Sequence, residues 1–119
     1  MNLAEFQNLP LHGGFRLLRV TVSEEPMVDA IGRLALAKTH VVGSTLEIEI
    51  ACSMPDPDEI SISLYHEVLE AATVAAPSPP ASVWELNEAG FELAARAYHQ
   101  RLGMATPDTL NQMLADFGF

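Results

Sequence analysis

The stretch Thr45–Cys52, which reads TLEIEIAC, decides the first half of the fold. Its leucine and isoleucines alternate with glutamates, so a strand formed here has one apolar face and one charged face. The earlier stretch FRLLRVTV, at residues 15–22, alternates in the same way from Leu18 onward. We therefore predict two strands, each with one buried face.

The segment between these strands gives weaker signals. Residues 33–37 follow Gly32 and form a further strand candidate, and a turn around Gly43 leads into TLEIEIAC. Residues 26–31 fit one short helical turn. The first half of the chain is thus predicted to form a small sheet of about three strands, in which TLEIEIAC is the edge strand.

The second half of the chain has the apolar spacing and the boundary residues of helices. The sequence PDPDE at 55–59 is a helix start, because it combines prolines with acids in the first turn. Three helices are predicted, ending near Ala76, Leu102 and Gly118 and beginning near residues 55, 82 and 107. Trp84 is expected to anchor the second helix on the core. The prediction is a single α+β domain over residues 1–119, with the sheet packed on three helices.

Charge and composition exclude several classes of partner. Sixteen Asp and Glu stand against six Lys and Arg, for a net charge of −10. Nucleic-acid backbones and anionic membranes require a basic surface, so we expect neither as a partner. The sequence contains neither a secretory leader pattern nor an apolar run long enough to span a bilayer, which predicts a soluble, cytoplasmic protein. The single cysteine, Cys52, is interpreted as a buried structural thiol.

The motif with chemical meaning is His66-Glu67-Val68-Leu69-Glu70, or HExxE, within the first predicted helix. A spacing of four residues places His66 and Glu70 one turn apart on one helix face, where both can reach a single metal ion. Glu67 lies about 100° around the helix axis, as a general base acting on metal-bound water requires. The alternative is an acidic helix face that looks at solvent, with His66 hydrogen-bonded to a neighbour.

Residues 65–71, YHEVLEA, resemble the zincin metallopeptidases, particularly small bacterial and phage-type zincin-like domains. The resemblance covers about residues 32–91. It implies that His66 and Glu70 bind zinc and that Glu67 activates water. Most active zincins have a histidine where this chain has Glu70, and the added negative charge favours harder metals such as Mn or Fe or indicates that catalysis has been lost.

A third ligand is needed for a catalytic zinc site. The sequence WELNEAGF at residues 84–91 is similar to the third-ligand helix of gluzincins, which implies Glu88, 18 positions after Glu70, as that ligand. Glu85 and Glu92 share a helix face with Glu88 and are interpreted as a solvated acidic surface. In zincins a downstream histidine or tyrosine often stabilises the oxyanion, and the resemblance offers Tyr98 or His99 for this role.

Three functions are compatible with these residues. The leading prediction is a zincin-like peptidase that holds one divalent metal, Zn or alternatively Mn or Fe, and hydrolyses peptides, preferably basic ones. The second is a catalytically inactive zincin-like module for protein interaction or regulation. The third is a two-metal carboxylate site formed by one set of side chains: His66, Glu70, Glu88, Glu92 and His99.

Overall fold

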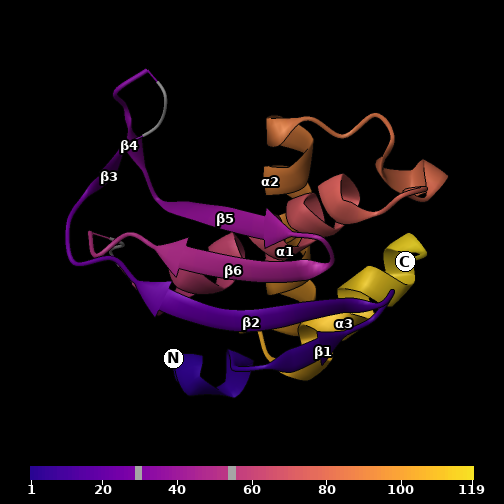
Figure 1. Cartoon of the computed structure of the whole chain (residues 1–119), viewed down its shortest axis with the longest axis horizontal. Helices are drawn as coiled ribbons and strands as arrows, with labels where there is room; N and C mark the ends of the chain where they lie inside the picture. The colour runs from indigo at the N-terminus through magenta and orange to yellow at the C-terminus, as the bar shows by residue number, and fades with distance from the viewer. Residues whose placement is uncertain (29–30, 54–55) are drawn as a thin grey trace.

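The computed structural model describes residues 1–28, 31–53 and 56–119. One layer is a mixed four-stranded sheet in the order β1-β2-β6-β5 (Figure 1), in which β2 and β6 are parallel and the outer pairs antiparallel. The strands are β1 (Leu9–Leu11), β2 (Phe15–Val22), β5 (Ala37–Val42) and β6 (Thr45–Ile50). The predicted α+β class is confirmed, and the sheet has four strands where about three were expected.

The strand TLEIEIAC lies inside the sheet, so its prediction as the edge strand is wrong. The parallel partner β2 pairs with one side of β6, and β5 returns through the turn at Gly43 to pair with the other side. The sequence underestimates β5, because its AKTHVV pattern mixes polar and apolar residues. β5 is therefore an edge strand of the sheet. It is the edge that lies next to the acidic residues of the helices.

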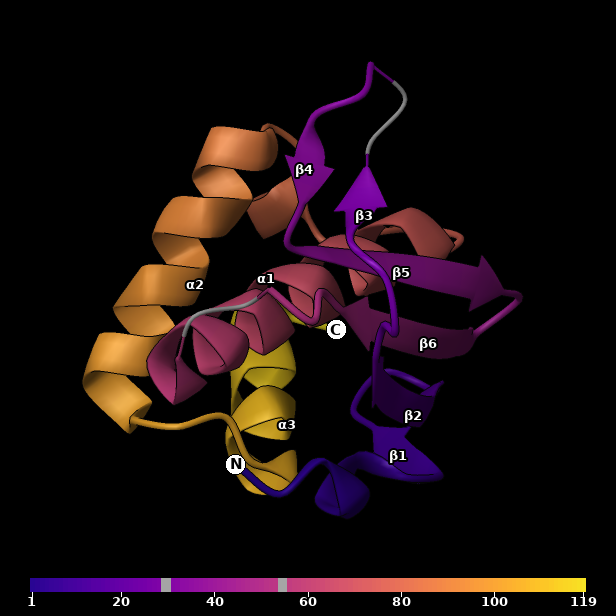
Figure 2. The same cartoon turned by 90° about the vertical axis from the view of Figure 1, so that its left-hand side faces the viewer.

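A separate two-stranded ribbon connects β2 to β5. It consists of β3 (Met27–Val28) and β4 (Leu34–Ala35), which pair antiparallel and project beyond the sheet (Figure 2). The helical turn predicted for residues 26–31 is wrong, because residues 27 and 28 are extended and paired. Residues 29–30 lie outside the described part of the chain.

The helices form the second layer and cover one face of the sheet. They are α1 (Pro57–Ala75), α2 (Glu88–Leu102) and α3 (Pro107–Phe117), with the 3-10 turns η1 (Leu3–Phe6) and η2 (Ala81–Val83). Asp56 caps α1 by accepting from the Glu59 N–H at 2.9 Å. The start of α2 is later than predicted because Asn87 caps it instead, accepting from the Gly90 N–H at 2.9 Å. None of the helices in the described residues has the length and apolar character needed to cross a bilayer.

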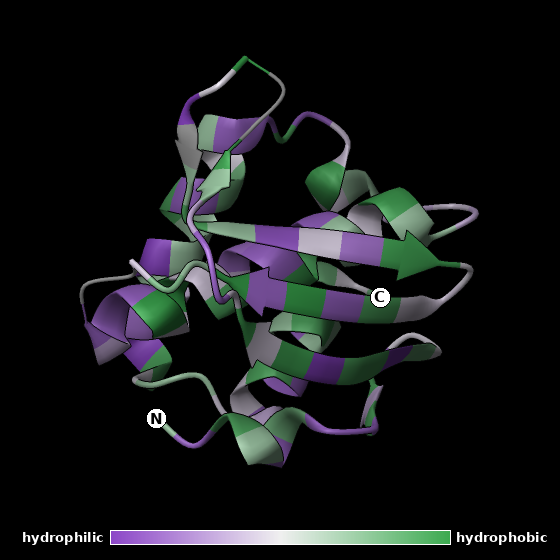
Figure 3. Cartoon of the chain, turned by 60° about the vertical axis from the view of Figure 1, so that its left-hand side comes forward, coloured by the Kyte–Doolittle hydropathy of each residue, from purple (hydrophilic) through white to green (hydrophobic). Residues whose placement is uncertain are grey.

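The alternation in β6 separates core from surface. Leu46, Ile48 and Ile50 are at most 1% exposed and pack in one core with the apolar residues of α1. On the opposite face Glu47 pairs with Arg19 at 3.7 Å, and Glu49 pairs with Lys38 at 3.8 Å. Figure 3 shows this alternation of hydrophobic and hydrophilic residues along the strands. One face of the sheet therefore holds the helices, and the other carries paired charges.

Two side chains predicted to be buried are exposed. Cys52 lies beyond the end of β6 and is exposed, so the interpretation as a buried thiol is wrong. Trp84 lies between η2 and α2 with 71% of its surface exposed, and its indole N–H donates to the Pro79 carbonyl at 2.7 Å. β6 ends before Cys52 and α2 begins after Trp84, so both residues lie outside the strand and the helix in which they were predicted.

A buried serine joins the three helices. Ser61, with no exposed surface, accepts a hydrogen bond from the Ala105 N–H at 2.8 Å and lies 2.9 Å from Nδ1 of His99. Ser61 is on α1, His99 is on α2, and Ala105 precedes α3. This side chain therefore fixes α1 against the connection between the other two helices.

We expect Ser61→Ala to lower the free energy of unfolding by about 1–3 kcal/mol, because the buried Ala105 N–H then loses its acceptor. Urea unfolding followed by circular dichroism measures the change. The control is Ser78→Ala at an exposed position, where the change should stay within about 0.5 kcal/mol. Equal stability of the two variants would show that Ser61 does not join the helices.

Candidate metal site

Three of the predicted site residues converge where α1 meets α2. The Nε2 atom of His66 lies 3.0 Å from Oε2 of Glu70 and 3.2 Å from Oε2 of Glu88. One ligand atom from each of the three residues lies within 4.8 Å of the others. Side-chain exposure rises from 12% for His66 to 76% for Glu88, so the group lies at the surface end of a half-buried imidazole.

Local helix geometry explains this convergence. His66 and Glu70 are one turn apart on α1, as the HExxE spacing predicts. Glu88 is the first residue of α2, because the cap at Asn87 begins the helix there. The packing of α2 along α1 then brings the first turn of α2 over His66, whose ring lies 6.2 Å from that of Phe91.

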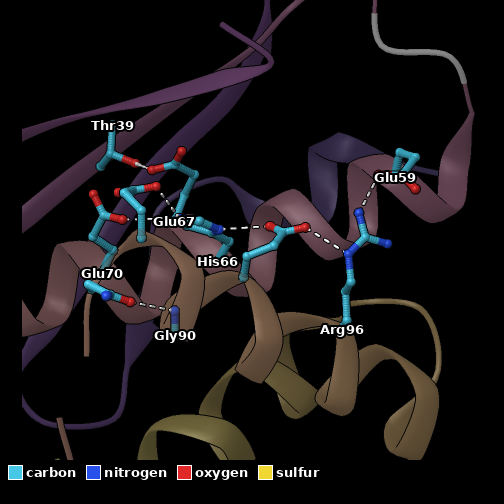
Figure 4. A network of polar contacts seen from close by, with 10 residues as sticks. Thr39, Glu59, His66, Glu67, Glu70, Gly90 and Arg96 are labelled. Atoms are coloured by element: carbon cyan, nitrogen blue, oxygen red, sulfur yellow. Dashed lines mark hydrogen bonds and ion pairs between the residues drawn. The ribbon is translucent and has the colours of Figure 1, made fainter. Parts of the chain in front are cut away.

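The other nitrogen of His66 has a carboxylate partner that the sequence analysis assigned to solvent. Glu92 Oε1 lies 2.9 Å from His66 Nδ1, and Glu92 Oε2 lies 2.9 Å from Arg96 Nε. Arg96 also reaches Glu59 of α1 at 3.5 Å (Figure 4). Glu92 is 39% exposed, as a surface glutamate would be, but it is also paired with two side chains, which the prediction of a solvated acidic surface did not include. The sequence did contain a signal that Glu92 is paired: Glu88, Glu92 and Arg96 follow one another at i, i+4 spacing on α2.

Glu67, the predicted base, points toward the sheet. The hydroxyl of Thr39 on β5 donates to Oε2 of Glu67 at 3.0 Å (Figure 4). Glu67 therefore lies between the edge strand and the two helices. Thr39 was not singled out in the sequence, since its role depends on the pairing of β5.

Burial and crowding of like charges shift the pKa values of this group. Burial raises the pKa of Glu67. Burial, reinforced by the neighbouring Glu88, raises the pKa of Glu70 to about 7. For His66, burial lowers the pKa, but the surrounding carboxylates, Glu92 first, outweigh burial and raise it overall. The group therefore holds protons near neutral pH that a cation can displace.

Two cavities flank Glu67 and Glu88, and both are lined by these two residues. One, of about 220 Å³, extends toward Arg96. The other, of about 380 Å³, extends along β5 toward Val41 and Val74. The donor group therefore borders open space between β5 and the helices.

The downstream residues proposed for other roles are engaged elsewhere. His99 contacts Ser61, and its Nε2 lies 3.3 Å from Asp58. Tyr98 donates from its hydroxyl to Asp116 at 2.9 Å. Neither lines the two cavities beside Glu67. Among the described residues, neither His99 nor Glu92 is part of the group that could hold a metal, which removes two members of the predicted two-metal set.

The donor set fits a divalent metal. An imidazole nitrogen and two carboxylate oxygens suit Zn²⁺, and three protein ligands leave a coordination position open. Comparisons with protein-family models, curated proteins and solved structures found no match to this chain.

The metal-free protein should lose stability as the pH rises from about 5 to about 8. The pKa of Glu70 is about 7 in the folded state against an ordinary value of 4.5, so the folded protein binds more protons than the unfolded chain between those values. The free energy of unfolding then falls with rising pH through that window, and the raised pKa of His66 adds stability that is lost above its ordinary value of 6.5.

Urea unfolding of the metal-free protein at both pH values measures this dependence. Glu70→Gln serves as the comparison, because it removes one titrating group and should flatten the profile. A wild-type profile that is flat, or that rises with pH, would contradict the assigned proton binding.

Proposed function

We propose that this chain is a metal-dependent peptidase of the zincin type. The observation that carries the proposal is the convergence of His66, Glu70 and Glu88 within 4.8 Å beside Glu67 and the outer edge of β5, which pairs with no further strand among the described residues. The imidazole and the two carboxylates would hold the metal. A carboxylate, a cation site and a strand edge are the parts that hydrolysis of an extended peptide needs.

The chain's own residues have distinct roles in this proposal. When bound, a metal supplies Lewis acidity that polarises a peptide carbonyl and lowers the pKa of water. Glu67 accepts a proton from the attacking water and later returns it to the leaving amine. Its raised pKa suits a group that both takes and gives a proton near neutral pH, and the bond from Thr39 orients its carboxylate.

Glu92 is proposed to position His66. Its hydrogen bond to Nδ1 fixes the ring so that Nε2 faces Glu70 and Glu88, as outer-shell carboxylates do at other metal sites. Arg96 in turn holds the second oxygen of Glu92. A further carboxylate ligand in place of a histidine makes the site more negative, so Mn or Fe joins Zn as a candidate metal.

The proposed substrate is an extended peptide paired with the free edge of β5. Backbone pairing with an exposed strand gives affinity without requiring a particular sequence. The cavities beside Glu67 lie along this edge. The net charge of −10 favours peptides with basic residues.

Purified protein should bind about one equivalent of Zn, Mn or Fe. His66→Ala, Glu70→Ala and Glu88→Ala should each lower metal affinity by at least about tenfold, a loss that even outer-shell changes can cause. Elemental analysis and competition with a chromophoric chelator measure occupancy and affinity. Glu85→Ala, an exposed glutamate just before α2, is the matched control for Glu88→Ala. Equal metal binding in all variants would reject the site.

Glu67→Gln should abolish peptide hydrolysis while leaving bound metal unchanged, because Glu67 is the proposed base and not a ligand. Cleavage of a denatured protein substrate, read by mass spectrometry, measures activity, and elemental analysis measures metal. Parallel loss of activity and metal would assign Glu67 a role in holding the site together instead.

One observation favours a non-catalytic module as the alternative. His66, when protonated, donates from Nδ1 to Glu92 and from Nε2 to the Glu70 and Glu88 pair, and Arg96 continues the network to Glu59. Such a network can stabilise the α1–α2 contact without a metal. Thermal unfolding with and without EDTA separates the two functions: unchanged stability of a metal-free preparation supports the module.

A further inference from the structure

A cavity larger than the two beside Glu67 lies at the opposite end of α1 from its N-terminal cap. It measures about 620 Å³, within the usual range for ligand pockets. It lies where the turns of the sheet meet the C-terminal ends of α1 and α3. The side chains of its wall are mainly apolar or small, among them Phe15, Ala75, Pro77, Pro80 and Phe119.

Aromatic packing fixes one wall of this cavity. The rings of Phe15 and Phe119 meet edge to face, with centroids 5.9 Å apart at 74°. Gly13 lies against both: a β-carbon there would come within 3.0 Å of the Phe15 ring and 3.1 Å of the Phe119 β-carbon. Since Gly13 also has a φ of 95°, any other residue would disturb this wall.

The electrostatics of the cavity disfavour anions. Both α1 and α3 end at it, and neither helix has a basic residue in its last turn. The C-terminal ends of helices carry partial negative charge on their free carbonyls. The apolar wall favours an uncharged apolar group, and the field at the helix ends disfavours an anionic one.

The cavity is separate from the cleft beside the candidate metal site, but its walls include the next residues along the same two chain segments. Val41 and Val74 line that cleft, and the neighbouring residues Gly43 and Ala75 line the large cavity. Thr39, which contacts Glu67, lies four residues before Gly43 on the same chain segment. Along an extended strand this separation is about 13 Å, or four residues of a paired peptide.

We propose that this cavity is a specificity pocket for an uncharged apolar side chain of the peptide substrate. A peptide antiparallel to β5 has its N-terminal part at Gly43, so the recognised residue lies about four positions before the cleaved bond. The inference rests on the proposed peptidase function. Its two parts, the pocket and its place relative to cleavage, can be tested separately.

The pocket itself is tested on metal-free protein with N-acetyl-leucinamide as probe and N-acetyl-aspartamide, which carries a free carboxylate, as comparison. Amide chemical shifts of Gly43, Ala75 and Gly118 should move with the leucine compound and not with the aspartate compound. Ala76→Phe and, as a second filling variant, Ser78→Phe should remove the effect, and Ala97→Phe on the exposed side of α2 should not. Absence of shifts with the leucine compound in wild-type protein would overturn the pocket.

Its place in the substrate is tested by cleavage of a proteome-derived peptide mixture by metal-loaded protein. We expect about tenfold enrichment of leucine, isoleucine or phenylalanine near the fourth position before the cleaved bond, the gain from burying one such side chain. Ala76→Phe should abolish the enrichment while cleavage continues, and Ala97→Phe should keep both. Cleavage without this preference overturns the inference alone, whereas no cleavage with intact leucinamide binding overturns the proposed function and the substrate assignment but leaves the pocket.

Discussion

The attraction between one half-buried imidazole and the carboxylates around it is the constraint on which the site depends. His66 has partners on both ring nitrogens, and these partners come from two helices. Holding several carboxylates close together is unfavourable unless a cation offsets their charge. A protonated histidine offsets part of that charge, and a divalent ion would offset more. The packing of α2 over α1 brings these carboxylates together around His66.

The sheet contributes the other half of the site. Without β5, Glu67 would face solvent and have no orienting partner, whereas the Thr39 hydroxyl now holds it between strand and helices. The parallel pairing of β2 with β6 pushes β5 to the outside, next to the acidic group. The same arrangement leaves a free strand edge beside a proposed base. Fold and site are therefore linked through a single strand.

Much of this could be predicted from the sequence, for local reasons. The alternation of TLEIEIAC and the starts of α1 and α3 depend on neighbouring residues and were predicted closely. The spacing of His66 and Glu70 is also local. Glu92 and the edge position of β5 depend on which elements pack side by side, and no local pattern contains that information. Trp84 shows the same limit, because a late start of α2 left it in the connection.

The pairing of β2 with β6 has a consequence for the order of assembly. These strands are parallel and separated in sequence by the whole β3–β4 ribbon and β5, whereas β5 and β6 are joined by a tight turn. Contacts between distant segments form slowly because a long loop must close first. During synthesis β2 leaves the ribosome well before β6, so the edge of β2 that pairs with β6 is unpaired in the meantime. We expect the β5–β6 hairpin to nucleate the sheet, with the earlier strand recruited onto it afterwards.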